Sequence, residues 1–200
     1  MILHLLDYFN SKQIILASQS PRRSQLLTEI GLQFRTVPAN CDENTVEPDG
    51  EKRALMNAVM KVEAIARQSD QFDLIIGSDT VVSYNSQIFE KPNSKAEAEW
   101  MLSQLSGTSH EVITGVCLKF KKQEVKFSEK TTVQFFQLQK PFITLYIDSG
   151  EPMDKAGAYG IQGTGASFVH SISGCFYNVM GLPVSRICQE LMNAYSGRLI

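Results

Sequence analysis

Apolar runs alternate with stretches of helical periodicity along most of the chain. Continuous apolar residues at 14–17 and 74–76 predict short, buried strands, and apolar residues recur at helical spacing over 51–68, which predicts a long helix. The apolar positions expected on one face of that helix are Leu55, Val59, Val62 and Ala66. Further helices are expected over 21–30, 95–105, 141–149 and 182–195, and further extended segments over 34–38, 159–161 and 167–172.

The central part of the chain predicts strands joined by hairpins. Val81–Val82 and Ile88–Phe89 flank a turn signal at Asn85–Ser86, and residues 110–120 and 124–136 both alternate with a period of two. Strands that alternate with helices, together with hairpin strands, predict an α/β fold in which helices flank a mixed β-sheet.

Composition and charge narrow the possibilities. Two hundred residues suit one large domain or two closely joined lobes, and a hydrophobic content of 43% is ordinary for a globular protein. The formal charge of −2 argues against a generally basic surface for nucleic acid, so an anion site has to be local. The apolar start, 1–9, is a poor signal peptide, and no apolar run has the length of a membrane span. We therefore expect neither nucleic acid nor a membrane as a partner.

The four cysteines are scattered, at Cys41, Cys117, Cys175 and Cys188. They form no C-x-x-C pair and no zinc pattern, and a disulfide framework is not expected in a chain of this size. Reduced cysteines predict a cytoplasmic protein.

A phosphate site is predicted where the first strand runs into the first long helix. Ser20 suits an N-cap, Pro21 suits the first helical position, and Gly31 suits the stop. The free N–H groups at the start of such a helix favour an anion, and Arg22 and Arg23 add guanidinium groups that match phosphate oxygens. The alternative is an ordinary capped helix with two solvated arginines.

Carboxylates and a lysine near the middle of the chain are candidates for the chemistry. Asp79 follows an apolar strand, and strand ends open onto crevices in α/β sheets, so it suits a metal ligand or a base. Asp42, Glu43 or Glu47 in the preceding acidic loop could share a divalent cation with it. Lys91 could reach a phosphate. The alternatives are a turn aspartate, solvated loop carboxylates and a surface lysine.

The segment 154–163 is rich in glycine, which lets the backbone approach a ligand closely. Lys155 adds a cation, and Gln162 offers paired donor and acceptor groups that suit the edge of a base. The alternative is a glycine-rich hairpin. The three histidines, His4, His110 and His170, have no ligand spacing and are interpreted as structural.

Five motifs in order resemble the Maf family of nucleotide pyrophosphatases. They are Ser18–Arg23, Gly77–Thr80, Glu90–Pro92, Asp154–Gly163 and Val179–Pro183. The resemblance implies one domain over 1–200 with an N-terminal extension at 1–12. It also implies an elongated mixed sheet flanked by helices, with two lobes around a cleft, as in inosine-triphosphate pyrophosphatases.

The resemblance further implies hydrolysis of a nucleoside triphosphate to the monophosphate and pyrophosphate, with Mg²⁺ or Mn²⁺ as cofactor. The implied catalytic residues are Asp79, Lys61 and Lys91, and the implied metal ligands are Glu43 and Asp79. The implied substrate-binding residues are Ser18, Arg22, Arg23, Thr80, Lys155 and Gln162. The residue after the helix lysine is Val62 instead of the usual alanine. The oligomeric state stays open, a homodimer included.

Two branches of the family differ in the base they accept. The branch that resembles 7-methylguanosine triphosphate pyrophosphatases tends to carry an aromatic residue, a glutamine and a glutamate where this chain has Arg22, Thr80 and Gln162. An aromatic ring and a carboxylate suit a cationic base, whereas an amide complements a neutral pyrimidine. The expected substrates are therefore dTTP and UTP, and modified pyrimidine nucleotides. The alternatives are a 7-methylguanosine triphosphate pyrophosphatase and a nucleotide-binding regulatory protein with little turnover.

Overall fold

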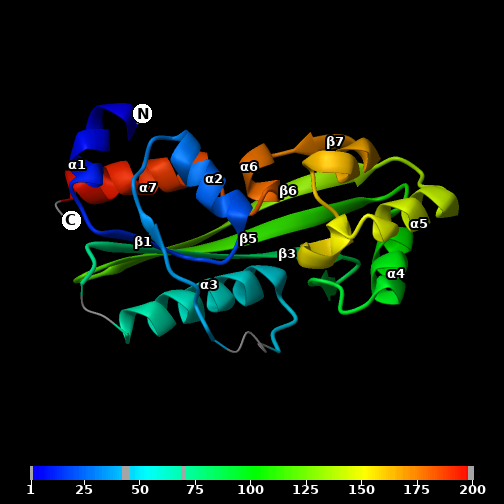
Figure 1. Cartoon of the computed structure of the whole chain (residues 1–200), viewed down its shortest axis with the longest axis horizontal. Helices are drawn as coiled ribbons and strands as arrows, with labels where there is room; N and C mark the ends of the chain where they lie inside the picture. The colour runs from blue at the N-terminus through cyan, green and yellow to red at the C-terminus, as the bar shows by residue number, and fades with distance from the viewer. Residues whose placement is uncertain (1, 42–45, 69–70, 198–200) are drawn as a thin grey trace.

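One mixed β-sheet runs the length of the molecule. The computed structural model describes residues 2–41, 46–68 and 71–197. Within these residues the sheet has seven strands in the order β2-β1-β3-β5-β6-β7, and β4 pairs with β3 (Figure 1). The strands are β1 (Ile14–Ala17), β2 (Arg35–Thr36), β3 (Leu74–Tyr84), β4 (Gln87–Phe89), β5 (Ser109–Phe120), β6 (Glu124–Phe135) and β7 (Val169–Ser173). β1 is parallel to β2 and β3, and the other pairings are antiparallel.

Helices cover both faces of the half of the sheet that contains β1. α3 (Gly50–Ala66) lies on one face, and α2 (Pro21–Glu29) and α7 (Val184–Ser196) lie on the other (Figure 1). Alternate residues of β1 serve the two faces: Ile15 packs in the core under α3, and Leu16 packs in the core under α2 and α7. The alternation explains why the short strand reads as a continuous apolar run.

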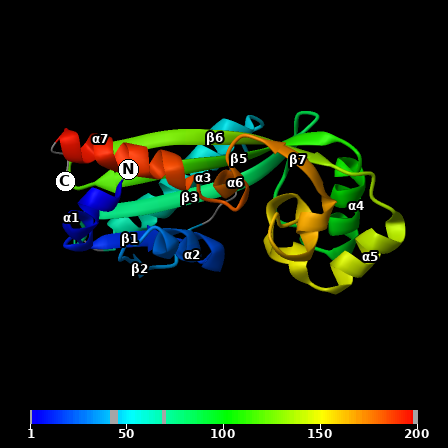
Figure 2. The same cartoon turned by 90° about the horizontal axis from the view of Figure 1, so that it is seen from above.

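The other half forms a second lobe with its own core. α4 (Lys95–Leu105), α5 (Lys140–Asp148) and the 3₁₀ turns η2 (Glu151–Asp154), η3 (Ala156–Ala158) and η4 (Gly163–Phe168) gather around the far ends of β3, β5 and β6 (Figure 2). The short α6 (Phe176–Val179) follows β7. Leu102, Tyr146 and Phe168 belong to the core of this lobe. The expected α/β fold with two lobes is confirmed.

Residues 2–12 are part of the folded body. They form η1 (Ile2–Leu5) and α1 (Leu6–Asn10), and Phe9 is fully buried in the core shared with α2 and α7. The Asn10 side chain donates to the carbonyl oxygen of Gly31 at 2.9 Å, at the end of α2. The segment thus packs against the first lobe and helps to hold the end of α2.

Several expected elements have different limits in the structure. The run at 74–76 continues as one strand to Tyr84, so Asp79 lies within a strand and not at its end. Residues 159–161 are outside the strands: they lie between the 3₁₀ turns η3 and η4, although Tyr159 itself is extended. Residues 167–168 belong to η4. The expected hairpin turn is confirmed, with positive φ at Asn85 and Ser86.

No helix within the described ranges is long and apolar enough to cross a membrane.

Candidate active site

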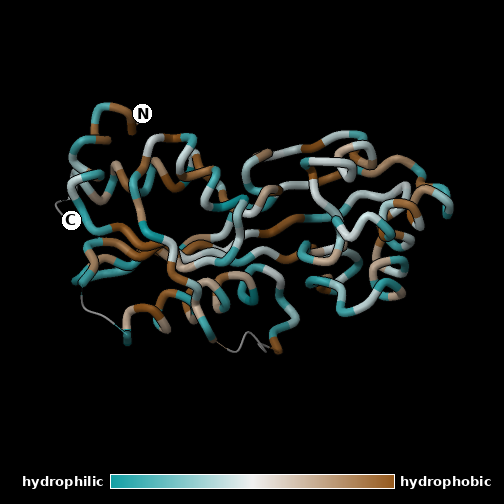
Figure 3. The backbone as a smooth tube through the Cα atoms, viewed as in Figure 1, coloured by the Kyte–Doolittle hydropathy of each residue, from teal (hydrophilic) through white to brown (hydrophobic). Residues whose placement is uncertain are grey.

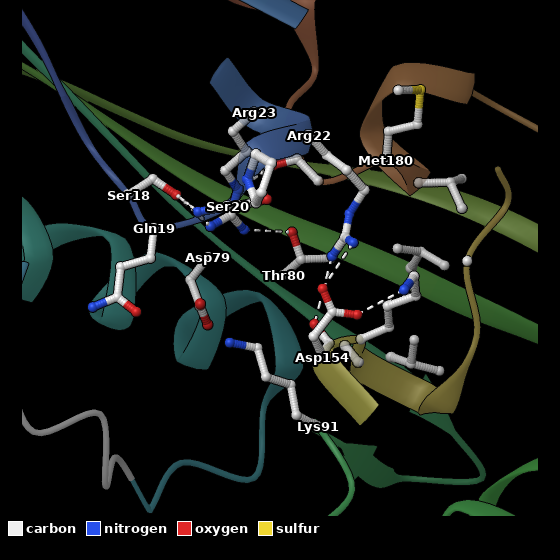
Figure 4. A pocket seen from close by; sticks show the side chains of 18 of the residues that line it. Ser18, Gln19, Ser20, Arg22, Arg23, Asp79, Thr80, Lys91, Asp154 and Met180 are labelled. Atoms are coloured by element: carbon white, nitrogen blue, oxygen red, sulfur yellow. Dashed lines mark hydrogen bonds and ion pairs between the residues drawn. The ribbon is translucent and has the colours of Figure 1, made fainter. Parts of the chain in front are cut away.

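The site lies beside a gap in the edge of β3. On that edge β1 pairs with β3 up to the Ala17–Gly77 pair, and β4 pairs with it from Val82 onward, while β5 occupies the opposite edge. On this edge, residues 78–81 of β3 pair with no other strand among the described residues. A cavity of about 440 Å³ opens here, and residues of both lobes line it (Figure 4).

Asp79 points from β3 toward α3. Lys61 Nζ lies 2.6 Å from Oδ1 of the carboxylate, and Asn57 Nδ2 donates to Oδ2 at 2.9 Å. Asn57 and Lys61 are one helical turn apart, so the same face of α3 presents both groups. The Asp79 side chain is 13% exposed, and it lines the cavity. One carboxylate thus faces the cavity with a donor on each oxygen.

Two glycines bring α3 close enough for these contacts. A Cβ atom at Gly115 would lie 2.3 Å from the backbone of Ala54, and one at Gly77 would lie 2.8 Å from the carbonyl oxygen of Ala58. Any larger residue at either position would push the helix away from the sheet. Gly77 and Asp79 are two residues apart in β3 and therefore lie on the same face of the strand. The close approach of α3 thus occurs next to the carboxylate.

The opposite face of β3 carries a second polar cluster around Arg23. Its guanidinium donates to the Gly181 carbonyl oxygen at 2.8 Å, to Thr80 Oγ1 at 3.1 Å and to Ser18 Oγ at 3.4 Å (Figure 4). Thr80 Oγ1 also lies 2.9 Å from Thr114 Oγ1. Arg23 therefore joins three chain segments at the cavity wall.

The start of α2 has the expected proline but not the expected side-chain cap. Pro21 occupies the first turn, and Gly31 follows the helix with φ +82°. Ser20 is at the N-cap position, but its side chain makes no capping hydrogen bond. Instead, the Ser20 N–H donates to Ser18 Oγ at 3.1 Å. The first turn of α2 lines the cavity, so its N–H groups lie close to where an anion would bind.

Arg22 spans the cavity mouth from one lobe to the other. Its Nη1 lies 3.0 Å from Oδ2 of Asp154 in η2, and Lys155 Nζ lies 2.6 Å from Oδ1 of the same carboxylate. Burial raises the pKa of Asp154, but the hydrogen bond from Lys155 and the charge of Arg22 outweigh burial and lower this pKa overall. One carboxylate thus balances two cations.

Lys91 lines the cavity, and the residue before it, Glu90, is held by two contacts. Arg53 of α3 forms an ion pair with Glu90 at 2.9 Å, and the Gly157 N–H donates to the Glu90 carbonyl oxygen at 3.1 Å. Figure 4 shows the Lys91 side chain reaching toward Asp79. The expected role of Lys91 near a phosphate is compatible with this position.

The charges around the cavity favour a polyanion. Its described lining contains five cationic side chains and two carboxylates, although the whole chain has a formal charge of −2. The cations are Arg22, Arg23, Lys61, Lys91 and Lys155. Val82, Ile161 and Met180 add an apolar wall. This combination suits a ligand with several phosphates and a flat, mostly apolar group.

Nine expected site residues within the described ranges line this one cavity, whereas the candidate carboxylate Glu47 does not line it and accepts from the Asp49 N–H at 2.9 Å. The nine residues are Ser18, Arg22, Arg23, Lys61, Asp79, Thr80, Lys91, Lys155 and Gln162. The expected metal ligand Glu43 lies outside the described residues. Among the described residues, no group of three or more His, Cys, Asp or Glu side chains is placed to hold a metal ion.

Sequence reasoning missed Asn57 and Asp154. Asp154 opens a motif in which only Lys155 and Gln162 were singled out. Asn57 precedes Lys61 by one helical turn, and a polar residue on the buried face of a helix was the available signal. The predicted buried face of the helix is partly confirmed: Val62 is buried, whereas Leu55, Val59 and Ala66 are half-buried. Ala54, Ala58 and Ile65 are buried instead.

Several known proteins are similar to this chain over most of its length. A dTTP/UTP pyrophosphatase of Clostridium perfringens is 43% identical over 185 residues, covering 90% of this chain and 96% of that protein. A dTTP/UTP pyrophosphatase of Symbiobacterium thermophilum is 42% identical over 180 residues, covering 90% and 93%. The solved structure of the Staphylococcus aureus Ham1 protein covers 93% of this chain and 98% of its own, with 13% identity and a TM-score of 0.50, which shows a shared fold.

The family described as Maf-like protein matches residues 13–194, which include all five motifs and every residue that lines the cavity. Residues 2–12, although packed into the first lobe, lie before the matched range. The chain belongs to the Maf family.

Proposed function

We propose that this chain is a nucleoside triphosphate pyrophosphatase that hydrolyses dTTP and UTP to the monophosphate and pyrophosphate. The observation that carries the proposal is the cavity itself, in which Asp79 lies among five cationic side chains and beside an apolar wall. The relatives named dTTP/UTP pyrophosphatase support the same activity and base.

Hydrolysis at the α-phosphorus needs a positioned water, neutralised phosphate charge and a stabilised leaving group. In this proposal Asp79 orients or deprotonates the water, because it is the carboxylate on the α3 side of the cavity. Arg23, Lys91 and the start of α2 bind the triphosphate, and Lys61 balances the charge of Asp79. Arg22 is released from Asp154 to contact a phosphate.

A divalent cation fits this donor set. Mg²⁺ is usually held by one or two carboxylates together with substrate phosphates, and Asp79 offers one hard oxygen donor at the cavity. Glu43 is proposed as a second ligand. When bound, Mg²⁺ or Mn²⁺ would neutralise phosphate charge and orient the leaving pyrophosphate.

Base choice is proposed to depend on Gln162 and Arg22, which line the cavity from opposite lobes. A neutral amide and an arginine suit a neutral pyrimidine better than cationic 7-methylguanine. Thr80 contributes less directly, since its hydroxyl is already bonded to Arg23 and Thr114. A cytoplasmic location and a homodimer stay predictions.

The test is a panel of nucleoside triphosphates, with and without Mg²⁺ or Mn²⁺, in which pyrophosphate and orthophosphate are measured separately. Monophosphate and pyrophosphate from dTTP and UTP are expected. Diphosphate and orthophosphate as main products would contradict the proposal, and faster turnover of 7-methylguanosine triphosphate would contradict the base assignment. Tight binding without turnover would favour the regulatory alternative.

Asp79→Asn provides the residue-level check on this panel. Loss of the carboxylate is expected to lower kcat by about 10²–10⁴-fold if it acts as the base, while the circular dichroism spectrum stays unchanged. Near-normal turnover in the folded variant would remove Asp79 from the mechanism.

A further inference from the structure

Asn57 is a polar residue on the buried face of α3. It is only 2% exposed, and its helix neighbours toward the sheet include Ala54 and Ala58. Burying an amide in such surroundings costs free energy unless the amide forms hydrogen bonds. Its Nδ2 donates to Asp79 Oδ2 at 2.9 Å, so the amide is placed where it acts on the proposed catalytic carboxylate.

The two donors on Asp79 differ in what they can fix. Lys61 is held at Oδ1 at 2.6 Å, but an ammonium is a point charge on a flexible stem and does not define the plane of a carboxylate. The terminal torsion of an aspartate is broad, so one bond leaves the carboxylate free to turn. A second bond to Oδ2 from the short, buried Asn57 side chain restricts this rotation. With the plane of the carboxylate fixed, the remaining lone pairs of its two oxygens have a fixed orientation relative to the cavity.

We propose that Asn57 is a positioning residue for the reaction: its side-chain amide holds the plane of the Asp79 carboxylate, so that this group meets the water and the metal ion in a constant orientation. The inference rests on the proposed function of Asp79. It assigns Asn57 no contact with substrate. The close packing of α3 at Gly77 and Gly115 is what brings a side chain as short as asparagine within reach of β3.

Asn57→Leu tests the proposal, because leucine has a similar volume and removes the donor. We expect kcat to fall by about 10–100-fold, as for other residues that orient a metal ligand, with KM for dTTP within about threefold of the wild-type value. Mn²⁺ binding in the presence of a non-hydrolysable dTTP analogue, measured by electron paramagnetic resonance, is expected to weaken by about 10-fold. Asn57→Ala removes the same donor without bulk and replaces the leucine variant if that one does not fold.

Thr131→Val is the matched control. Thr131 is buried like Asn57, its hydroxyl bonds to the backbone of Cys175 and accepts from the Asn178 amide, and none of these three residues lines the cavity. The control is expected to lower the melting temperature while kcat and Mn²⁺ binding stay at wild-type values. If Asn57→Leu behaves in the same way, with lower stability but unchanged kcat and Mn²⁺ affinity, the proposal is wrong.

A stability cycle tests the contact without any measurement of activity. Asn57→Leu, Asp79→Ala and the double variant are melted side by side. If the amide bonds to Asp79, the melting-temperature losses do not add, because the two single changes break the same bond. Strictly additive losses would overturn the proposed contact even in an active enzyme. If the wild-type protein releases no pyrophosphate, the proposed function is wrong. The stability cycle still tests the Asn57–Asp79 contact in that case.

Discussion

Arg22 and Arg23 are adjacent in the sequence but have different environments. Arg23 is half-buried, and its hydrogen bonds connect the start of α2 to β3 and to the Gly181 loop. Arg22 is more peripheral and pairs with the exposed Asp154 of the other lobe. The sequence predicts that Arg23 binds phosphate, and in the structure the same guanidinium also holds three segments of the cavity wall together.

This difference predicts different stabilities for two alanine variants. Arg23→Ala leaves the buried-side partners Thr80 and Gly181 without their donor and is expected to cost about 1–3 kcal/mol of unfolding free energy. Arg22→Ala breaks a partly exposed ion pair and is expected to cost about 1 kcal/mol or less. Denaturant unfolding measures both. Both variants are also expected to raise KM for dTTP, and equal stabilities would show that the bonds of Arg23 contribute little.

His110 makes stability depend on pH. It is buried beside Tyr159, with Nε2 2.8 Å from the tyrosine hydroxyl, and burial lowers the pKa of His110 to about 4. The ordinary value of about 6.5 applies in the unfolded chain, which therefore takes up a proton first as the pH falls. The contribution is fully present above about pH 6.5, and up to about 3 kcal/mol is lost as the pH falls to about 4.

Urea unfolding at pH 7.5 and pH 4.5 measures this loss. His110→Phe removes the titrating group and is expected to lose less stability between the two pH values than the wild type. His170→Gln changes an exposed histidine instead and is expected to keep the wild-type loss. A wild-type loss retained in His110→Phe would assign the pH dependence to other groups.

At the scale of elements, α3 is the helix that sets the geometry of the site. It begins at Gly50 after Asp49, whose side chain accepts from the N–H groups of Glu51 and Lys52. Its buried face carries Val62 and Ile65 as well as Asn57 and Lys61, and the small residues Ala54 and Ala58 lie where the sheet presents glycine at 115 and 77. The distance between the backbone of α3 and the sheet thus determines whether Asn57 and Lys61 reach Asp79.

Gly115→Ala tests this dependence on distance. The added methyl group would lie 2.3 Å from the backbone of α3, so the helix has to shift. We expect a stability loss of about 1–3 kcal/mol from overpacking, and a kcat at least about 10-fold lower because Asn57 and Lys61 move away from Asp79.

Gly150→Ala is the comparison for this variant. Gly150 has φ +78° with nothing within 4 Å of an added Cβ, so it reports backbone strain alone, about 1–2 kcal/mol, with unchanged kcat. Wild-type kcat in Gly115→Ala would show that the helix position is not critical.

At the scale of the whole molecule, the site is shared between two lobes on one sheet. β3 and β5 run through both lobes, so the lobes have a common framework (Figure 2). The Arg22–Asp154 ion pair also links the two lobes at the cavity. The first lobe supplies the start of α2 and the end of β1, and the second supplies Lys155 and Gln162. The apolar wall is shared, because Ile161 and Met180 pack in the core of the first lobe and Val82 packs in the core of the second. We therefore expect a bound nucleotide to contact both halves of the molecule.

Base choice is proposed to depend on residues of both lobes. Arg22→Trp combined with Gln162→Glu is expected to lower kcat/KM for dTTP and to raise it for 7-methylguanosine triphosphate, because an aromatic ring and a carboxylate favour a cationic base. Thr80 is left unchanged, since its hydroxyl supports Arg23. The ratio of kcat/KM for the two substrates is the measurement. An unchanged ratio would place base selection elsewhere in the cavity.

The local features of the fold can be predicted from the residues of each short segment. Proline at the start of α2, glycine at its end and the periodicity of 95–105 predicted the helices, because propensities and caps act over a few residues. The hairpin at Asn85–Ser86 followed from turn chemistry in the same way. The short motifs identified most of the residues that line the cavity, because the chemistry of a side chain depends on its residue type.

How these helices and strands pack against each other depends on contacts between segments that are far apart in the sequence. Asp79 was expected at a strand end, yet the strand that ends at the cavity is β1, and the gap arises because β1 and β4 each pair with only part of β3. Strand lengths of this kind depend on pairing between distant segments, which local patterns do not encode. The same holds for Asn57, whose bond to Asp79 exists because glycines in two different strands let α3 approach the sheet.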